Sequence, residues 1–279
     1  MDQQQMIVLH NAWKIYIDSF WEESMNKIEA IILDLDGTLL DDNKKIGGKT
    51  IEYLKQIKNN VKIIPASARQ FCTIKPYLET LDLLEENNYT ICFNGSLIVN
   101  NKEAEIFSSY IDKSVVIKID DFILDNNIYW TYYLYDSRLL RNDISNIDEF
   151  VNKNKIYKIV GISTPEVIDK IRNNLPKCIL DNLEITSSEL NRIEFVNKGM
   201  TKVKAIESLL NKLDIDKENV VAIGDGDNDI DMIKYVGCGI AMLNSPEIVK
   251  ENADIVTKRS NNEDGVYYVI NELLSKGSE

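Results

Sequence analysis

The sequence predicts an α/β protein with a Rossmann-like parallel-sheet core, helices on both faces of that sheet, and an inserted α+β cap domain. Short apolar runs, typical of fully buried strands, alternate with segments whose apolar residues recur at helical spacing. Two of these runs end in carboxylate clusters. Between about residues 113 and 190, aromatic and β-branched residues cluster instead, which indicates a separate module of mixed strands and helices.

The 279 residues therefore divide into three predicted parts. Residues 1–27 form an N-terminal extension with apolar residues at helical spacing, and nothing in it resembles a signal peptide. Residues 28–112 and 191–279 form the catalytic core, and residues 113–190 form the cap, which we expect to set substrate specificity. Nowhere does an apolar run approach the roughly 18 residues of a membrane span.

Composition limits the partners. The formal net charge is −13 and there is a single histidine, His10, which argues against a surface that binds nucleic acid. A small anionic substrate remains compatible, because a few local cations and a metal ion outweigh the overall charge. The four cysteines contain no CxxC pair, as expected for reduced, buried thiols of a cytoplasmic protein without a disulfide or zinc site. We expect no membrane partner, and either a monomer or a small homo-oligomer.

The first buried strand, residues 31–33, leads directly into Asp34, Asp36, Gly37 and Thr38. In open parallel sheets, ligands bind beyond the carboxyl ends of the strands, so both aspartates should lie at the mouth of a site. Two carboxylates one residue apart project the same way and repel each other unless a cation lies between them. Mg²⁺ is the usual cation for such oxygen ligands.

The second strand, residues 61–66, ends in Ser67-Ala68-Arg69. A hydroxyl, the backbone N–H groups that follow and a guanidinium could together bind a phosphate. The alternative is that Ser67 merely caps the N-terminus of the next helix. A third strand, residues 90–93, leads into the turn Asn94-Gly95-Ser96, and a hairpin is expected after it.

The last third of the chain repeats the acidic pattern. Thr201 is expected to cap a helix over residues 202–213, and the strand at residues 220–224 runs into Asp225-Gly226-Asp227-Asn228-Asp229. An EF-hand is excluded, since its required glycine and glutamate positions hold Ile230 and Val236. No phosphate-binding P-loop motif occurs. A parallel sheet would bring the two acidic strand ends side by side.

These parts support phosphoryl transfer. Asp34 can attack phosphorus to give an aspartyl-phosphate if the phosphoryl charge is neutralised. Asp36 could protonate the leaving oxygen and then deprotonate the water that releases phosphate. A lysine near the start of the helix would neutralise the transferring group. Lys202 is the first candidate for that lysine, and spacing alone leaves Lys198 and Lys204 as alternatives.

Four stretches in order resemble the motifs of the haloacid dehalogenase superfamily: residues 34–38, Ser67-Ala68-Arg69, Lys202 and residues 224–229. Three further stretches resemble its Cof-type branch of sugar-phosphate phosphatases: Asn94-Gly95-Ser96, residues 239–242 and residues 263–266. The resemblance spans about residues 28–270. In that branch a large α/β cap is inserted between the second and third motifs.

The resemblance implies a role for each matching residue. Asp34 is nucleophile and metal ligand, Asp36 is acid/base and a ligand through its backbone carbonyl, and Asp225 is a ligand. Asp229 orients the water shell of the metal. The residues expected to bind the substrate's phosphoryl group are Ser67, Ala68, Arg69, Lys202 and Asn228.

The sequence departs from the branch at three places. Ala68 and Val203 stand where glycine is common, and Leu243-Asn244-Ser245 replaces a glycine-containing turn. These changes affect the fit of the substrate more than the chemistry, because no carboxylate or lysine is lost.

The expected function is a Mg²⁺-dependent phosphatase of small phosphorylated metabolites, chiefly sugar phosphates. Two alternatives remain open. A phosphosugar mutase resembling phosphomannomutases would share the four motifs. A catalytically idle protein that keeps the fold is the other, and the intact Asp36 argues against it.

Overall fold

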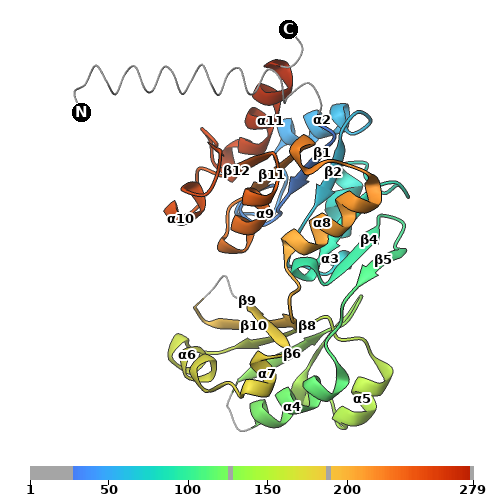
Figure 1. Cartoon of the computed structure of the whole chain (residues 1–279), viewed down its shortest axis with the longest axis vertical. Helices are drawn as coiled ribbons and strands as arrows, with labels where there is room; N and C mark the ends of the chain where they lie inside the picture. Colours follow the sequence, from blue (N-terminus) through green and yellow to red (C-terminus); the bar gives the residue numbers. More distant parts are fainter. Residues whose placement is uncertain (1–27, 125–127, 187–189, 277–279) are drawn as a thin grey trace, which may run out of the picture.

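The computed structural model describes residues 28–124, 128–186 and 190–276, and it has two domains (Figure 1). The larger domain, at the top of Figure 1, contains both ends of the described chain, and the smaller cap lies below it. The helix expected within residues 1–27 lies outside the described residues. No described helix has both the length and the apolar character needed to span a membrane.

The core sheet has five parallel strands in the order β13-β12-β11-β1-β2. The strands are β1 (Ala30–Leu33), β2 (Lys62–Pro65), β11 (Val220–Gly224), β12 (Cys238–Ala241) and β13 (Ile255–Val256). Their connections cross over through helices, as parallel pairing requires. Because β1 pairs with β11 in the register Leu33 to Ile223, the acidic segments that follow both strands begin side by side.

Helices cover both faces of this sheet, because its strands are apolar on both sides. Ile31 and Leu33 pack toward α2 (Gly48–Ile57), α3 (Phe71–Thr80) and α11 (Gly265–Lys276). Ala30 and Ile32 pack toward α8 (Lys202–Leu213) and α9 (Ile230–Tyr235) on the other side. The predicted fold class is therefore confirmed, and α8 has the predicted bounds.

A small antiparallel sheet continues from the core. It contains β3 (Tyr89–Cys92), β4 (Leu97–Asn100) and β5 (Glu105–Ser108), so the predicted hairpin after the third strand is confirmed. A bridge between Ala66 and Ile91 attaches β3 to the end of β2. The remaining short elements of the core are α10 (Glu247–Lys250) and the 3-10 helices η2 (Phe93–Gly95), η4 (Lys217–Asn219), η5 (Asp227–Asp229) and η6 (Asn261–Glu263).

The cap is a five-stranded antiparallel sheet in the order β7-β6-β8-β10-β9. Its strands are β6 (Tyr129–Tyr133), β7 (Arg138–Leu140), β8 (Lys158–Ile162), β9 (Leu183–Thr186) and β10 (Arg192–Asn197). The other cap elements are α4 (Lys113–Leu124), η3 (Arg141–Asp143), α5 (Ile147–Lys153), α6 (Pro165–Asn174) and α7 (Lys177–Leu180). The cap helices lie on the side of the sheet away from the core, which leaves the other face toward the core (Figure 1).

The predicted cap boundary at residue 190 is too early. Strand β10 lies between β8 and β9 in the cap sheet, whereas the sequence analysis assigns it to the second core segment, residues 191–279. Ile193 and Phe195 are buried in the cap's own hydrophobic cluster, where Phe195 stacks on Trp130 at 6.0 Å between ring centroids. The cap thus extends to Asn197, because β10 completes its core.

All four cysteines are free. The prediction that they are buried is correct for Cys92 and Cys238 and wrong for Cys72 and Cys178, which are exposed.

Candidate active site

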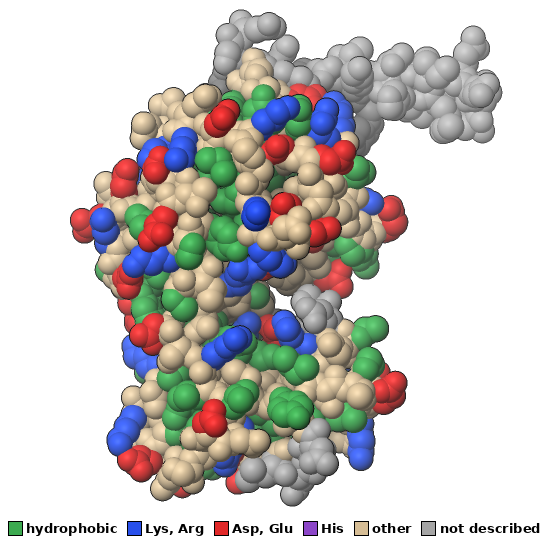
Figure 2. All heavy atoms as spheres, turned by 180° about the vertical axis from the view of Figure 1, so that it is seen from behind, with side chains coloured by type: hydrophobic (Ala, Val, Ile, Leu, Met, Phe, Trp, Pro, Cys, Tyr) green, Lys and Arg blue, Asp and Glu red, His purple; other side chains and the backbone are tan. Residues whose placement is uncertain are grey.

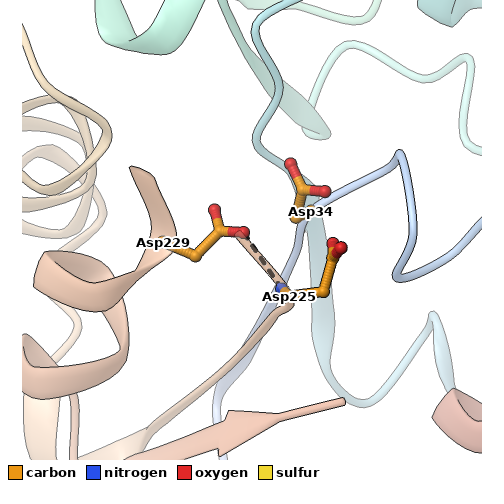
Figure 3. A group of neighbouring side chains, drawn as sticks. All are labelled: Asp34, Asp225 and Asp229. Atoms are coloured by element: carbon orange, nitrogen blue, oxygen red, sulfur yellow. Dashed lines mark hydrogen bonds between the residues drawn. The ribbon is translucent and has the colours of Figure 1, made fainter. Parts of the chain in front are cut away.

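Three carboxylates meet where the core sheet ends (Figure 3). Asp34 follows β1, Asp225 follows β11, and Asp229 ends η5 at the start of α9. Each offers one oxygen, and these oxygens all lie within 4.8 Å of one another. Asp34 and Asp229 are buried. Oxygen donors gathered this closely match the ligand preference of hard divalent cations.

The turn after β1 packs closely against Asp225. Gly37 has φ +81°, and a Cβ there would lie 2.2 Å from Asp225 Oδ2, so no other residue fits without displacing the carboxylate. The Thr38 hydroxyl donates a hydrogen bond of 2.8 Å to Asp225 Oδ1. The Asn244 side chain donates to the carbonyl of Gly37 at 2.8 Å, which supports the same turn. This turn therefore fixes Asp225 beside Asp34.

Both oxygens of Asp229 are engaged. Its Oδ2 accepts from the backbone N–H groups of Asp225 (3.1 Å) and Gly226 (3.0 Å), and its Oδ1 accepts from Lys202 at 2.7 Å. Asp229 thus organises the loop that carries Asp225. This arrangement is compatible with the predicted role of orienting the surroundings of a metal ion, which stays a prediction.

Lys202 lies in the first turn of α8, and Thr201 caps that helix as predicted, accepting from the N–H of Lys204. The buried Lys202 ammonium donates to Asp34 Oδ1 at 2.5 Å and to Asp229 Oδ1 at 2.7 Å. Lys198 instead lies 3.5 Å from Glu184, and Lys204 is exposed. Of the three lysines that spacing left open, only Lys202 reaches the carboxylates.

The clustering perturbs the ionisation of these groups. Burial raises the pKa of Asp34 to about 8, against the opposing effect of Lys202 and with further elevation from Asp229 and Asp225. Burial likewise raises the pKa of Asp225 to about 6. For Lys202, burial favours the neutral amine, but Asp229 and Asp34 outweigh it and raise the pKa. The lysine thus stays charged, and the carboxylates resist ionisation without a further cation.

The raised pKa values of Asp34 and Asp225 predict that Mg²⁺ stabilises the fold to an extent that depends on pH. The elevated pKa values mean that the metal-free fold holds more protons than the unfolded chain between pH 3.8 and about 8, so ionisation destabilises it as pH rises. A cation that binds the ionised carboxylates should stabilise the fold more at pH 8 than at pH 5. The measurement is thermal unfolding with and without Mg²⁺ at both pH values. An equal shift, or a larger one at pH 5, would contradict the assignment.

Asp36 has a different environment. Its half-exposed carboxylate receives two hydrogen bonds of 2.6 Å from the Arg69 guanidinium and one of 2.6 Å from Lys44. Burial opposes ionisation, but these hydrogen bonds outweigh it and hold the pKa of Asp36 below its usual range. The carboxylate is not part of the three-membered cluster. Coordination through the Asp36 backbone carbonyl therefore stays a prediction.

The structure separates the two interpretations of Ser67. The N-cap of α3 is Gln70, so Ser67 does not cap that helix. The buried Ser67 hydroxyl oxygen accepts from the N–H of Arg69 at 3.2 Å, and its own proton stays available to a ligand. The side-chain amide of Asn228, in the segment that follows β11, donates to the side-chain oxygen of Asn94 at 3.4 Å.

A cavity of about 750 Å³ lies between the core and the cap. The predicted residues Asp34, Asp36, Ser67, Ala68, Arg69, Asn228, Asp225 and Asp229 all line it, and Lys202 lies behind Asp34. Sequence reasoning missed the other side chains that line it: Lys44, Gln70, Thr73, Asn94, Tyr133, Arg138, Lys158, Arg192, Glu194, Asp227 and Pro246. Two of these had a local signal: Asn94 in the turn Asn94-Gly95-Ser96, and Asp227 in the acidic segment that follows β11.

The cap contacts the core at the loop after β2. The Lys158 ammonium, from β8, donates to the carbonyl of Ala68 at 3.0 Å. The Gln70 side chain donates to the carbonyls of Leu134 (3.0 Å) and Ser137 (2.8 Å), between β6 and β7. The cap therefore holds the Ser67-Ala68-Arg69 segment and the residue that follows it in place.

The known proteins that this chain resembles are hydrolases and phosphatases. A family model described as haloacid dehalogenase-like hydrolase matches residues 31–270. The chain is 31% identical to the putative phosphatase YxeH of Bacillus subtilis, over 88% of this chain and 98% of that protein. It is 30% identical to the 5-amino-6-(5-phospho-D-ribitylamino)uracil phosphatase YcsE of the same organism, over 86% and 93% of the two chains.

Among solved structures, a haloacid dehalogenase-like hydrolase from Bacteroides thetaiotaomicron is similar, with a TM-score of 0.79 and 27% identity over 88% of this chain and 100% of the other.

Proposed function

Because the chain belongs to the haloacid dehalogenase-like hydrolases, we propose that it is a Mg²⁺-dependent phosphatase of small phosphorylated metabolites, acting through an aspartyl-phosphate on Asp34. The family match and the relatives named as phosphatases support phosphatase activity. The observation that carries the proposal is the convergence of Asp34, Asp225 and Lys202 at the core end of a cavity closed by the cap. Sugar phosphates, or similar phosphorylated polyols, are the substrates we expect first.

The donor set fits Mg²⁺. Lys202 donates to Oδ1 of Asp34 and Thr38 to Oδ1 of Asp225, and no described residue donates to the Oδ2 atom of either. The carboxylates of Asp34 and Asp225, with the Asp36 carbonyl, would hold the ion. When bound, it neutralises charge on the carboxylates and on the phosphoryl group.

Asp34, Asp36 and Lys202 then have separate roles in the reaction. An Asp34 oxygen forms a bond to phosphorus while the ester P–O bond breaks, and Asp36 gives its proton to the departing oxygen. Water next attacks the phosphorus of the aspartyl-phosphate, Asp36 takes up the water's proton, and phosphate leaves with Asp34 restored. Lys202 keeps the Asp34 carboxylate oriented throughout, from its position 2.5 Å from Oδ1.

Arg69 links substrate binding to the acid/base step. In the substrate-free structure it holds Asp36 ionised, and an ionised carboxylate cannot act as an acid. A phosphate ester competes for the same guanidinium, since Arg binds phosphate in the same bidentate way as carboxylate. Moving Arg69 toward the ester would remove two of the three hydrogen bonds that favour the ionised Asp36, so Asp36 would take up a proton more readily. Ser67 and Asn228 line the same part of the cavity and would bind the remaining phosphoryl oxygens.

The test is phosphate release from a panel of phosphorylated sugars, polyols and nucleotides, with Mg²⁺ and with EDTA. We expect release from several sugar or polyol phosphates in Mg²⁺ and none in EDTA. Failure to release phosphate from any ester, combined with isomerisation of a sugar phosphate after addition of a bisphosphorylated sugar, would favour the mutase. Neither activity in a protein that still binds Mg²⁺ would favour a catalytically idle one.

A further inference from the structure

The open face of the cap sheet lines the cap side of the cavity. In antiparallel strands, residues that pair directly project to the same face. Tyr133 pairs with Lys158 on one side and with Arg138 on the other, so these three side chains share one end of that face. All three line the cavity. They therefore lie opposite the carboxylates and face the part of a substrate that leaves.

Lys158 is held rigidly at this end. Its buried ammonium donates to Glu194 Oε2 at 3.2 Å and to the Ala68 carbonyl at 3.0 Å, and it lies 5.0 Å from the centre of the Tyr133 ring. An ammonium group has three donors, and these two hydrogen bonds use two of them. One donor of a fixed cation thus stays available to a ligand beside the phosphate-binding loop.

The cap side of the cavity is rich in cations. Among the described residues, the cap contributes Arg138, Lys158 and Arg192 to the lining, with Glu194 as the carboxylate that contacts both Lys158 and Arg192. The Arg138 guanidinium makes no ion pair or hydrogen bond with another described side chain. Blue side chains on both rims of the hollow between the domains are visible in Figure 2.

On the core side, carboxylates outnumber the two lining cations, Lys44 and Arg69. Five aspartates line it: Asp34, Asp36, Asp225, Asp227 and Asp229. A single phosphoryl group can be accommodated there by Lys202, Arg69 and a divalent cation. A second anion would be repelled by the same aspartates and attracted to the cap. The cavity is thus mainly acidic on its core side and mainly basic on its cap side.

We propose that the substrate carries a second anionic group, a phosphate or a carboxylate, on its leaving portion, and that Arg138 and Lys158 bind this group. The inference rests on the proposed phosphatase function and narrows it. A leaving group with neutral hydroxyls alone would gain little from a guanidinium that has no carboxylate partner. An anionic group gains a charge-assisted, bidentate contact.

The test compares substrates that differ only in the second group. Sorbitol 6-phosphate is set against 6-phosphogluconate, which adds a carboxylate, and fructose 6-phosphate against fructose 1,6-bisphosphate, which adds a phosphate. We expect kcat/KM to be at least about tenfold higher for the charged member of one or both pairs, the usual advantage of a charge-assisted hydrogen bond. The pair that shows it identifies the anion.

Arg138→Met should reduce that preference about tenfold, and Arg138→Lys should restore part of it. Arg172→Met is the matched control, because Arg172 is an exposed arginine on the helical side of the cap, in α6, and does not line the cavity. It should keep the full preference. Equal hydrolysis within both pairs, or an equal loss for charged and neutral substrates in Arg138→Met, would overturn this inference and leave the phosphatase function intact. No hydrolysis of any ester would overturn both.

Discussion

Asp34→Asn is expected to abolish phosphate release, with kcat at least about 10⁴-fold below wild type, because removing a covalent nucleophile has the largest effect among single catalytic substitutions. An amide cannot form the aspartyl-phosphate, and the substitution also removes one cation ligand. Phosphate release from the best ester in the panel measures the loss. Mass spectrometry of acid-quenched protein should find one added phosphoryl group in wild type and none in the variant.

Folding should survive this substitution. Burial already opposes a charged Asp34, whose pKa is raised to about 8, so a neutral amide relieves repulsion from Asp225 and Asp229. Without Mg²⁺ at pH 8, the variant's melting temperature should equal or exceed that of wild type. Asp231→Asn is the control, because Asp231 follows the same acidic segment in α9 but is exposed and outside the cavity. Activity above about a tenth of wild type in Asp34→Asn would exclude Asp34 as the nucleophile.

The sequence predicted the meeting of the two acidic strand ends better than any other feature of the site. The order of apolar runs and acidic segments is enough to place the two acidic strand ends together, because parallel pairing of β1 with β11 puts both carboxyl ends at one edge. Lys202 could be singled out only in three dimensions. Lys198, Lys202 and Lys204 are close in sequence, and the direction of α8 decides which one points at Asp34.

Partnerships across long sequence separations could not be predicted. The Asp36 to Arg69 ion pair depends on how the loops after β1 and β2 curve toward each other. Arg138 and Lys158 belong to strands with no motif, and they reach the site only because the open face of the cap sheet is turned toward the core. The predicted cap boundary was wrong for a similar reason. The sequence of β10 is that of an ordinary buried strand, and only its pairing with β8 and β9 assigns it to the cap.

Lys202→Met should produce the largest change in stability. Lys202 is the cation that contacts Asp34 and Asp229, and methionine keeps much of its length without its charge. Removing one partner from a buried ion pair typically costs about 3–5 kcal/mol of unfolding free energy, because the remaining charges stay buried without compensation. Activity should fall by about 10²–10³-fold as well, since a fixed group that stabilises developing charge is lost.

The sign of the pH dependence separates this cause from a simple packing defect. Without Lys202, the raised pKa of Asp34 should rise further, so the folded variant holds a proton that the unfolded chain has released above about pH 4. Its stability should therefore decline as pH rises from 5 to 8. In wild type the lysine is charged over that whole range, because its pKa is raised above 10.5, so it compensates the negative charge that Asp34 acquires as pH rises.

Urea unfolding of wild type and Lys202→Met at pH 5 and pH 8, without Mg²⁺, measures this difference. We expect the gap in unfolding free energy between the two proteins to be larger at pH 8. Lys204→Met, an exposed position two residues further along α8, should show almost no gap at either pH. A gap that is the same at both pH values would mean that methionine merely packs poorly. In that case the carboxylates would not depend on Lys202 for their charge balance, and its assignment as their counter-ion would fail.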